Sequence, residues 1–462
     1  MRYISTRGAA APQSFADMLL AGLAPDGGLY LPETWPRFTP AEIAAFGKQS
    51  YPHAARTIIG RLAGDSFSED ELQADIGAAY ATFDDPRIAP LVEIGPGLYL
   101  MELFHGPTLA FKDVALQVLG RLFARALKRK GGRATVLAAT SGDTGSAAIA
   151  ALGGLENIEV FVLHPKGRVS EVQRRQMTTA PFANVHNLAV EGSFDDCQAI
   201  VKALFAETDF SAAVNLTAVN SINFARIAAQ AVYYFTAAAQ LGAAPVFVVP
   251  TGNFGDVFAG EAATRMGLPV DKLVVATNAN DIMARALNEG VYAAGTAQPT
   301  LSPSMDIQVA SNFERALFEA CDRDSRWIAE AMDGFARTSR IELPQTVLAE
   351  LRTRYDATRC GDEQTLATIA RVHAETGRLI DPHTAVAVTA CYNLKLQKKV
   401  PVVVLSTAHP AKFPDAVRQA TGRIPPVPPR LKQALEGAEK CDVTAAEKRL
   451  VRELIAARLP RP

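Results

Sequence analysis

Lys112 has a sequence context in which a lysine could act as a nucleophile. An apolar run at residues 98–104 predicts a strand, and residues 114–128 have the apolar spacing of a helix. A Gly-Pro pair ends the strand and Thr108 can cap the helix, so Lys112 should fall in its first turns. The positive end of the helix dipole, together with burial, would lower the pKa of this amine. Such a lysine can form a Schiff base with a carbonyl compound, whereas the alternative is an ordinary surface lysine.

Two glycine-rich loops, residues 140–146 and 250–256, have the form of anion-binding turns. Each follows a short apolar run and precedes a helical stretch, so several backbone N–H groups would converge where the helix dipole favours negative charge. Neither loop is followed by Gly-Lys-Ser/Thr, and neither fits G-x-G-x-x-G, which argues against nucleotide binding. Taken singly, each could equally be a tight strand-to-helix connection.

The elements that must position these residues alternate along the chain. Apolar, largely β-branched runs are separated by stretches with helical spacing, a pattern that predicts an α/β fold with parallel sheets covered by helices on both faces. The predicted strands are residues 98–104, 134–139, 158–163, 185–190, 246–249, 273–277 and 400–405. Ligands of such sheets bind beyond the carboxyl ends of the strands. Lys112 and both glycine-rich loops follow strands, so one shared site is expected.

Length and composition restrict the class of protein. A chain of 462 residues favours two or three domains, and a net charge of −1 gives no electrostatic footprint for nucleic acid or an anionic membrane. No apolar run approaches the ~18 residues of a membrane-spanning helix, and the first residues lack a signal-like apolar region. The five cysteines form no C-x-x-C pair, which argues against a zinc site and a disulfide framework. We expect a cytoplasmic protein without a metal.

Three regions are expected along the chain. Residues 1–92 predict a mixed N-terminal domain, with helices at 14–23, 40–46 and 68–81 and a short strand at 29–31. Interruptions are expected at Pro40, Pro52 and Asp85-Pro86. Residues 93–430 should hold the catalytic region in two α/β subdomains, with residues 279–396 mainly helical. A proline-rich spacer then leads into a charged helical tail at 431–462.

Taken together, these motifs resemble those of threonine synthase, a pyridoxal-phosphate (PLP) enzyme family of fold type II. The resemblance covers residues 5–413 without a departure at the motif positions. Its main motifs are residues 105–113 for the Schiff-base lysine, 140–146 for the substrate side, 250–256 for the cofactor phosphate, and 406–413 near the C-terminus. Smaller matches are residues 5–8, 22–30, 220–226 and 311–315.

The resemblance implies roles for individual residues. Lys112 would hold PLP and then act as general acid and base. Thr407 would face the pyridine nitrogen, where a hydroxyl in place of a carboxylate suits elimination and replacement chemistry. The cofactor phosphate would be bound by Gly252, Asn253, Phe254, Gly255 and Asp256, mostly through backbone N–H groups, although the Asp256 carboxylate more plausibly caps the next helix.

The substrate side is implied in the same way. The substrate carboxylate and the cofactor's phenolic oxygen would be bound by Ser141, Asp143 and Thr144, and a substrate phosphate by Ser221, Asn223 and Arg226. Lys166 and Arg168 are further phosphate candidates, and all these charges could instead lie on the surface. The implied reaction is that of a carbon–oxygen lyase acting on phosphate: O-phospho-L-homoserine and water give L-threonine and phosphate, the last step of threonine biosynthesis, in a monomer or homodimer.

Two other readings fit part of this pattern. A PLP lyase of the same fold would release a keto acid, and the first three motifs do not exclude it. A PLP-type fold reused as a binding module would have no need of Lys112. The N-terminal region and residues 406–413 favour threonine synthase.

Overall fold

The computed structural model describes residues 1–140, 142–218, 221–396 and 400–459. The chain forms two compact units, each assembled from separate segments. Unit 1 comprises Met1–Leu19, Leu23–Ala115 and Ser221–Pro426, and unit 2 comprises Leu20–Gly22, Leu116–Asn220 and Val427–Pro462. The boundaries expected at residues 92 and 430 do not coincide with this division, because most of residues 1–92 pack into the same unit as residues 221–426.

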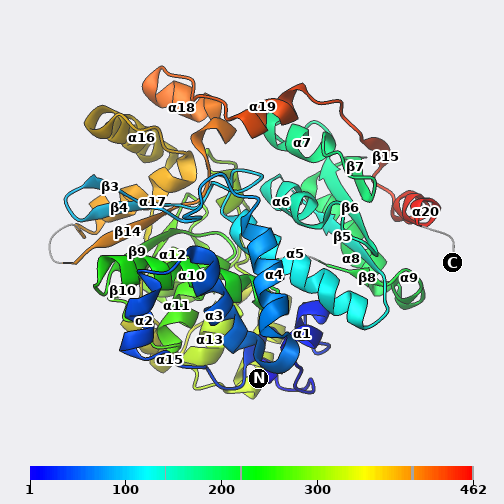
Figure 1. Ribbon diagram of the computed structural model, residues 1–462, viewed down its shortest axis with the longest axis horizontal. Coiled ribbons are helices and arrows are strands. Elements are labelled where there is room, and N and C mark those ends of the chain that lie inside the picture. The colour runs from blue at the N-terminus through cyan, green and yellow to red at the C-terminus, as the bar shows by residue number, and fades with distance from the viewer. Residues whose placement is uncertain (141, 219–220, 397–399, 460–462) are drawn as a thin grey trace. The chain divides into compact units, whose positions relative to one another are not determined.

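Unit 1 is built on a six-stranded sheet with the strand order β13-β10-β9-β14-β4-β3 (Figure 1). Its strands are β3 (Leu91–Gly95), β4 (Leu98–Glu102), β9 (Val246–Pro250), β10 (Lys272–Thr277), β13 (Tyr355–Arg359) and β14 (Val402–Ser406). All neighbours pair in parallel except β3, which is antiparallel to β4. The parallel strands expected in this unit are confirmed, but the two edge strands, β3 and β13, were not predicted because they lack continuous apolar runs.

Helices cover both faces of this sheet. On one face, α16 (Asp362–Thr376) and α17 (Pro382–Asn393) pack against the side chains of Val248 and Val404. On the other, Tyr234 of α10 (Phe224–Leu241) lies edge-on to Phe247 of β9, with the ring centroids 4.7 Å apart. Successive residues of a strand face opposite sides, so the complete burial of β9 and β14 follows from this double cover.

The remaining elements of unit 1 flank this sheet. They are β1 (Tyr3–Ser5), β2 (Tyr30–Pro32), α2 (Pro40–Phe46), α3 (Tyr51–Ala63), α4 (Glu69–Tyr80), α11 (Gly255–Arg265), α12 (Ile282–Glu289), β11 (Val291–Ala293), α13 (Phe313–Ala320), α14 (Ser325–Thr338), β12 (Arg340–Glu342), α15 (Gln345–Arg354) and α18 (Pro414–Thr421), while α1 (Phe15–Ala21) lies mostly in this unit. Helix α2 begins at Pro40 and has the predicted bounds, whereas Pro52, expected to interrupt structure, lies in the first two positions of α3. At both positions the missing N–H costs no hydrogen bond.

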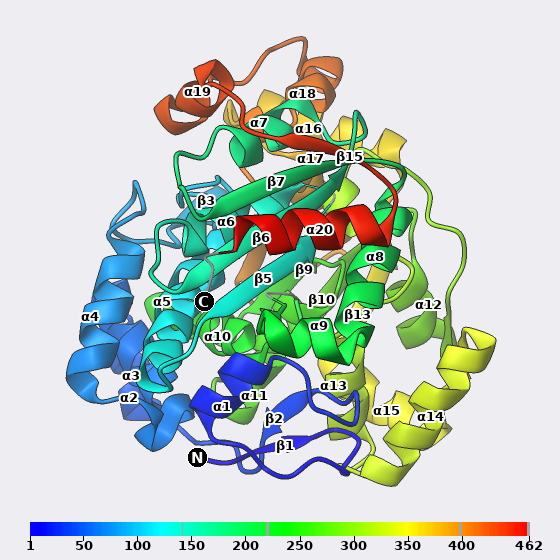
Figure 2. The ribbon, with the colours of Figure 1, turned by 90° about the vertical axis from the view of Figure 1, so that its right-hand side faces the viewer.

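Unit 2 is built on a parallel five-stranded sheet in the order β15-β7-β6-β5-β8. Its strands are β5 (Ala134–Ala139), β6 (Ile158–Pro165), β7 (Val185–Glu191), β8 (Leu216–Thr217) and β15 (Asp442–Ala445), and its helices include α6 (Asp143–Leu152), α7 (Glu171–Thr178), α8 (Phe194–Ala206), α9 (Thr208–Ala213), α19 (Pro429–Glu436) and α20 (Lys448–Arg458). Helix α5 (Lys112–Arg129) begins in unit 1 and continues into unit 2. Figure 2 shows α20 lying across the strands of this sheet.

The C-terminal segment is part of unit 2. Helix α20 is the charged helix expected within residues 431–462, and strand β15 was not predicted. Strand β15 adds to the edge of the sheet by pairing with β7. Val451 and Ile455 of α20 are fully buried in a cluster with Phe161 and Leu188. The charged residues of α20 concealed this apolar stripe, which recurs at i and i+4 on one side of the helix.

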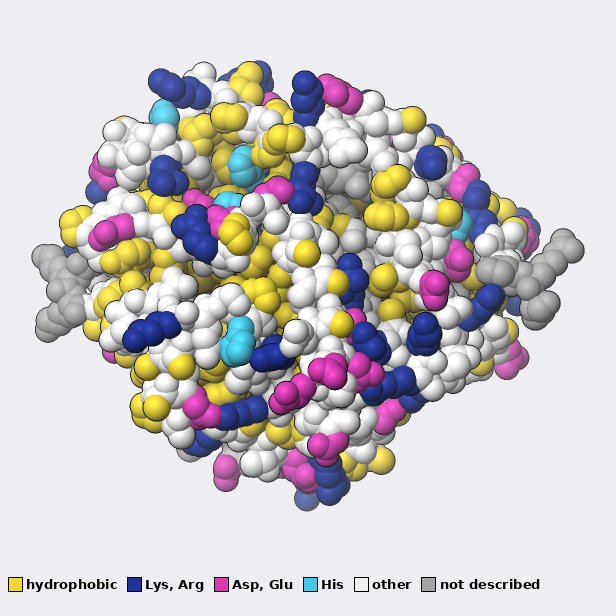
Figure 3. Space-filling model, viewed as in Figure 1, with side chains coloured by type: hydrophobic (Ala, Val, Ile, Leu, Met, Phe, Trp, Pro, Cys, Tyr) yellow, Lys and Arg dark blue, Asp and Glu magenta, His cyan; other side chains and the backbone are white. Residues whose placement is uncertain are grey.

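The surface carries charges of both signs. On the face shown in Figure 3, Lys and Arg side chains are interspersed with Asp and Glu side chains. Among the described residues, no helix is both long and apolar enough to cross a membrane.

Candidate active site

Lys112 is the first residue of α5, as predicted, and its side chain is only 9% exposed. Its Nζ atom lies 4.8 Å from the centroid of the Phe111 ring. The preceding loop is fixed by Asp113, whose carboxylate accepts hydrogen bonds from the backbone N–H and the hydroxyl of Thr108, both at 2.7 Å. The buried Lys412 donates from Nζ to the Thr108 carbonyl at 2.7 Å. The catalytic candidate therefore sits on a rigid support.

Backbone hydrogen bonds join the Lys112 loop to the segment that carries Thr407. The N–H of Phe111 donates to the Thr407 carbonyl at 2.8 Å, and the N–H of His409 donates to the Leu109 carbonyl at 3.1 Å. Thr407 directly follows β14 and is 5% exposed. These backbone hydrogen bonds hold the segments of Lys112 and Thr407, almost 300 residues apart in sequence, next to each other at the carboxyl end of the sheet.

The loop between β9 and α11 presents a row of free backbone donors. The N–H groups of residues 252–257 have no hydrogen-bond acceptor in the described part of the chain. Phe254 adopts a left-handed conformation with φ of 64°, and its ring packs against Phe313 and Tyr355. Because the ring is buried, the loop offers backbone N–H groups and not the Phe254 side chain to a ligand. The loop has the chemistry of a phosphate site.

Gly252 allows a second loop to approach this one. A Cβ atom at position 252 would lie 2.9 Å from the Ser304 carbonyl oxygen. The N–H of Ser304 donates to Nε2 of His383 at 3.2 Å, and Nδ1 of His383 is 2.7 Å from the Asp381 carboxylate. His383 therefore holds the neighbouring loop in place.

Asp256 does not cap α11, which corrects the expected role of its carboxylate. Its Oδ1 atom accepts hydrogen bonds from the hydroxyls of Tyr233 and Tyr234, while Oδ2 has no partner among the described residues. Burial raises the pKa of Asp256 to about 7, although the tyrosine hydrogen bonds and the positive charges of Arg226 and Lys112 oppose the shift. The two tyrosines lie on α10, a long-range pairing that local spacing does not reveal.

The predicted substrate-phosphate residues divide into two kinds. Arg226 is 5% exposed, its Nε atom has no partner within the described residues, and burial lowers its pKa to about 10. Asn223 is already engaged: its side-chain oxygen accepts from the Ala225 N–H at 3.1 Å and its amide donates to the Leu19 carbonyl at 2.8 Å. Ser221 is half-buried. Arg226 is therefore the stronger candidate for binding an anion, and Asn223 caps α10.

The substrate-side loop belongs to unit 2. Ser141 lies outside the described residues. Asp143 begins α6, is 5% exposed and accepts a hydrogen bond from the Gln173 amide at 2.9 Å, while Thr144 is half-buried. The Thr140 hydroxyl accepts from the N–H groups of Gly142 and Gly145, both at 3.0 Å. Gln173 was not predicted, because it lies 30 positions from Asp143 and shares no motif with it.

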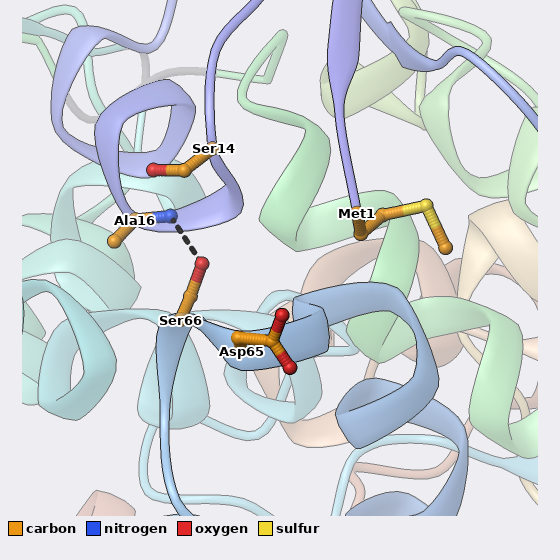
Figure 4. Close-up of a pocket in the computed structure, with 5 residues that line it drawn as sticks. All are labelled: Met1, Ser14, Ala16, Asp65 and Ser66. Atoms are coloured by element: carbon orange, nitrogen blue, oxygen red, sulfur yellow. Dashed lines mark hydrogen bonds between the residues drawn. The ribbon is translucent and has the colours of Figure 1, made fainter.

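Several other candidate site residues already have hydrogen-bond or ion-pair partners. His105 lies 2.9 Å from the Glu102 carboxylate, and Lys166 forms an exposed ion pair with Glu191. Burial lowers the pKa of His409 to about 4. A small hollow in unit 1, lined by Met1, Ser14, Ala16, Asp65 and Ser66, contains none of the motif residues (Figure 4). Among the described residues, no group of three His, Cys, Asp or Glu side chains could hold a metal ion.

Comparisons with known proteins agree with this arrangement. Residues 85–344 match the family "Pyridoxal-phosphate dependent enzyme", residues 2–80 match "Threonine synthase N terminus", and residues 384–455 match "Threonine synthase, C-terminal". The threonine synthase of Pseudomonas aeruginosa is 49% identical over 451 residues, which is 97% of this chain and 96% of the relative.

Solved structures give the same result for the fold. PLP-bound threonine synthase from Brucella melitensis has a TM-score of 0.97 at 47% identity and covers 99% of both chains. The yeast threonine synthase structure has a TM-score of 0.94 at 38% identity and covers 99% of this chain and 98% of its own. The fold is therefore PLP fold type II, as expected. With a buried lysine, a donor-lined glycine loop and relatives matched over nearly their whole length, the chain belongs to the threonine synthase family of PLP-dependent enzymes.

Proposed function

We propose that this enzyme converts O-phospho-L-homoserine and water to L-threonine and phosphate, with PLP held as a Schiff base by Lys112. The observation that carries the proposal is the buried Lys112 side chain, fixed on the same backbone frame as Thr407 in the unit that also contains the donor-lined loop. This set fits the three ends of PLP: an amine for the aldehyde, a hydroxyl for the pyridine nitrogen, and unpaired N–H groups for the phosphate.

PLP, when bound, supplies an electron sink that stabilises negative charge on substrate carbons. The protein's own contribution is to position groups and move protons. The Lys112 amine would take a proton from the substrate α carbon and then from the β carbon, in a setting where its 9% exposure limits competition from bulk water. The Thr108–Asp113 hydrogen bonds fix the loop that carries this amine, so less conformational entropy is lost when the amine is positioned for each proton transfer.

The substrate would be bound through charge and hydrogen bonding. The unpartnered guanidinium nitrogen of Arg226 supports a role in binding the substrate phosphate, because a buried unpaired donor gains most from an anion. Asp143 and Thr144, with Ser141, would line the substrate carboxylate and the phenolic oxygen of the cofactor. The existing hydrogen bonds of Asn223 support a capping role for it, with Ser221 contributing through its loop.

The test combines an absorbance spectrum with product analysis. Wild-type protein should show the visible band of a lysine-bound PLP and should form threonine and phosphate from phosphohomoserine in equal amounts. Lys112→Ala should lose both, whereas Lys128→Ala, an exposed position in the last turn of the same helix, should keep both. A normal band with a keto acid as the product would move the enzyme to the PLP lyases, and no band in wild type after adding PLP would refute the proposal.

We also propose that the enzyme works in the cytoplasm as a monomer or homodimer. All five cysteines are free thiols, and Cys197, Cys360 and Cys391 are buried, as suits a reducing compartment. Light scattering on the purified protein, read against the chain mass of 49.3 kDa, decides between the two assemblies.

A further inference from the structure

Asn312 connects two loops that its sequence position does not suggest. Its backbone N–H and its side-chain amide both donate to the Asn253 carbonyl, each at 3.0 Å. The same side-chain amide donates to the Ser221 carbonyl at 3.1 Å. Asn312 is 0% exposed. One side chain therefore holds both the phosphate loop after β9 and the loop that leads into α10.

The Asn253 carbonyl determines the direction of a key donor. In a planar trans peptide the C=O of one residue and the N–H of the next point in opposite directions. Holding the Asn253 oxygen toward Asn312 therefore turns the Phe254 N–H away from Asn312. This N–H is one of the donors that have no acceptor in the described part of the chain. Asn312 thereby sets the orientation of a phosphate-binding group without touching the phosphate.

Arg315 fixes Asn312 in turn. Its guanidinium donates to the Asn312 side-chain oxygen, to the Ile222 carbonyl at 2.6 Å and to the Tyr30 carbonyl at 3.1 Å. Because Arg315 occupies the Asn312 oxygen, the Asn312 amide must face the two loops. Arg315 is 0% exposed, and burial lowers its pKa to about 9, so it still carries its charge at neutral pH. The pair is a connected network of buried donors and acceptors.

The neighbouring Glu314 attaches the N-terminal region to the same point. Its carboxylate accepts from the Thr6 hydroxyl at 2.5 Å and from the Arg7 guanidinium at 3.1 Å. Tyr30, the Arg315 acceptor, pairs with Ser5 across the β1–β2 ladder. Segments of three sequence motifs, at residues 5–8, 221–226 and 311–315, thus meet beside the phosphate loop.

We infer that Asn312 and Arg315 are positioning residues for the cofactor phosphate: they orient the Asn253–Phe254 peptide so that its N–H can bind that group. The inference rests on the proposed function, since it requires PLP in this loop. Its specific consequence is that disturbing the pair should weaken binding of the phosphate arm of the cofactor and leave binding of its ring unaffected.

Asn312→Asp separates this role from a general effect on folding. The substitution keeps the oxygen that pairs with Arg315 but replaces the amide donor with a second acceptor, which faces the Asn253 carbonyl. Losing both amide hydrogen bonds, to the Asn253 and Ser221 carbonyls, and placing a carboxylate oxygen against the Asn253 oxygen should raise the PLP dissociation constant at least about tenfold. Pyridoxal, which lacks the phosphate, should bind as it does to wild type. Both constants can be measured by dialysing holoenzyme against graded concentrations of each compound.

A matched control and a second variant complete the test. Asn288→Asp changes an exposed amide that bonds the Ala357 carbonyl, and it should alter neither constant. Arg315→Lys keeps the positive charge but cannot reach three acceptors at once, so it should also weaken PLP selectively. Equal weakening of PLP and pyridoxal, or wild-type PLP binding in both variants, would overturn the inference. Wild type that binds no PLP would instead refute the proposed function, and the inference with it.

Discussion

Asp256 is a buried carboxylate whose charge state the protein controls. Its partners are two tyrosine hydroxyls, which support a carboxylate less well than full cations would, and burial raises its pKa from 3.8 to about 7. Since the folded protein holds this proton over a pH range in which the unfolded chain has released it, the group's contribution to the free energy of unfolding falls as pH rises from about 4 to about 7.

Asp256→Asn should remove this pH dependence from the cofactor-free protein. The amide is neutral at every pH. The free energy of unfolding of Asp256→Asn, relative to that of wild type, should therefore increase by on the order of 2 kcal/mol as pH rises from about 5 to about 8. Urea unfolding at a series of pH values measures this difference. Asp415→Asn, at a side chain that is 91% exposed, is the control. Parallel curves for wild type and Asp256→Asn would show that the carboxylate ionises normally.

Individual residues show where sequence reasoning succeeds and where it fails. Lys112 was placed correctly because strand, Gly-Pro and helix follow one another within a short stretch. The role of Asp256 was wrong because its partners, Tyr233 and Tyr234, come from another helix. Local patterns fix local geometry, but the hydrogen-bond partners of a buried side chain depend on packing between distant segments.

At the scale of elements, buried parallel strands were the most predictable feature. Strand β5 has the predicted bounds, and β6, β7, β9 and β10 differ from theirs by one or two residues. Their apolar runs are continuous because both faces are covered. Edge strands such as β13 and β15 carry polar residues on an uncovered side, so their sequences do not differ from those of loops. Their pairing becomes evident only once the sheet is assembled.

The Lys112 loop is an element whose close packing makes a sharp prediction. A Cβ atom at Gly106 would lie 2.4 Å from the Asp113 Cβ atom, so Gly106→Ala must displace the loop that carries Lys112. A shift of about 1 Å in a catalytic group costs on the order of a hundredfold in rate, and we expect kcat to fall by about that factor. Circular dichroism should stay that of wild type, because the strained contact involves one loop.

Gly95→Ala is the matched control for this loop, since a Cβ atom there would meet no atom within 4 Å. Its kcat and its cofactor absorbance should equal those of wild type. If Gly106→Ala also retained the wild-type kcat, the Thr108–Asp113 contacts would not be needed to position Lys112.

At the scale of the whole molecule, the division of the chain was the least predictable feature. Each unit is made of three separate segments, and unit 2 ends with β15 and α20, far in sequence from β5, β6, β7 and β8. Periodicity describes each helix or strand by itself and carries no information on which distant segments share a core. The motifs gave the chemistry of the site, while the unit to which each motif belongs came from the structure.

This division makes a thermodynamic prediction about the cofactor. Lys112, residues 252–257 and Thr407 all belong to unit 1, so PLP should stabilise that unit directly. A ligand at about a hundredfold its dissociation constant adds about 2.7 kcal/mol to the stability of the state that binds it.

Calorimetry tests this prediction. PLP should raise the unfolding temperature of the transition that Leu273→Ala lowers, since Leu273 lies in the unit 1 core. Leu163→Ala, a fully buried position in unit 2, marks the other transition. A cofactor effect confined to the transition marked by Leu163→Ala would place the binding energy in unit 2 and contradict the assignment of the phosphate loop.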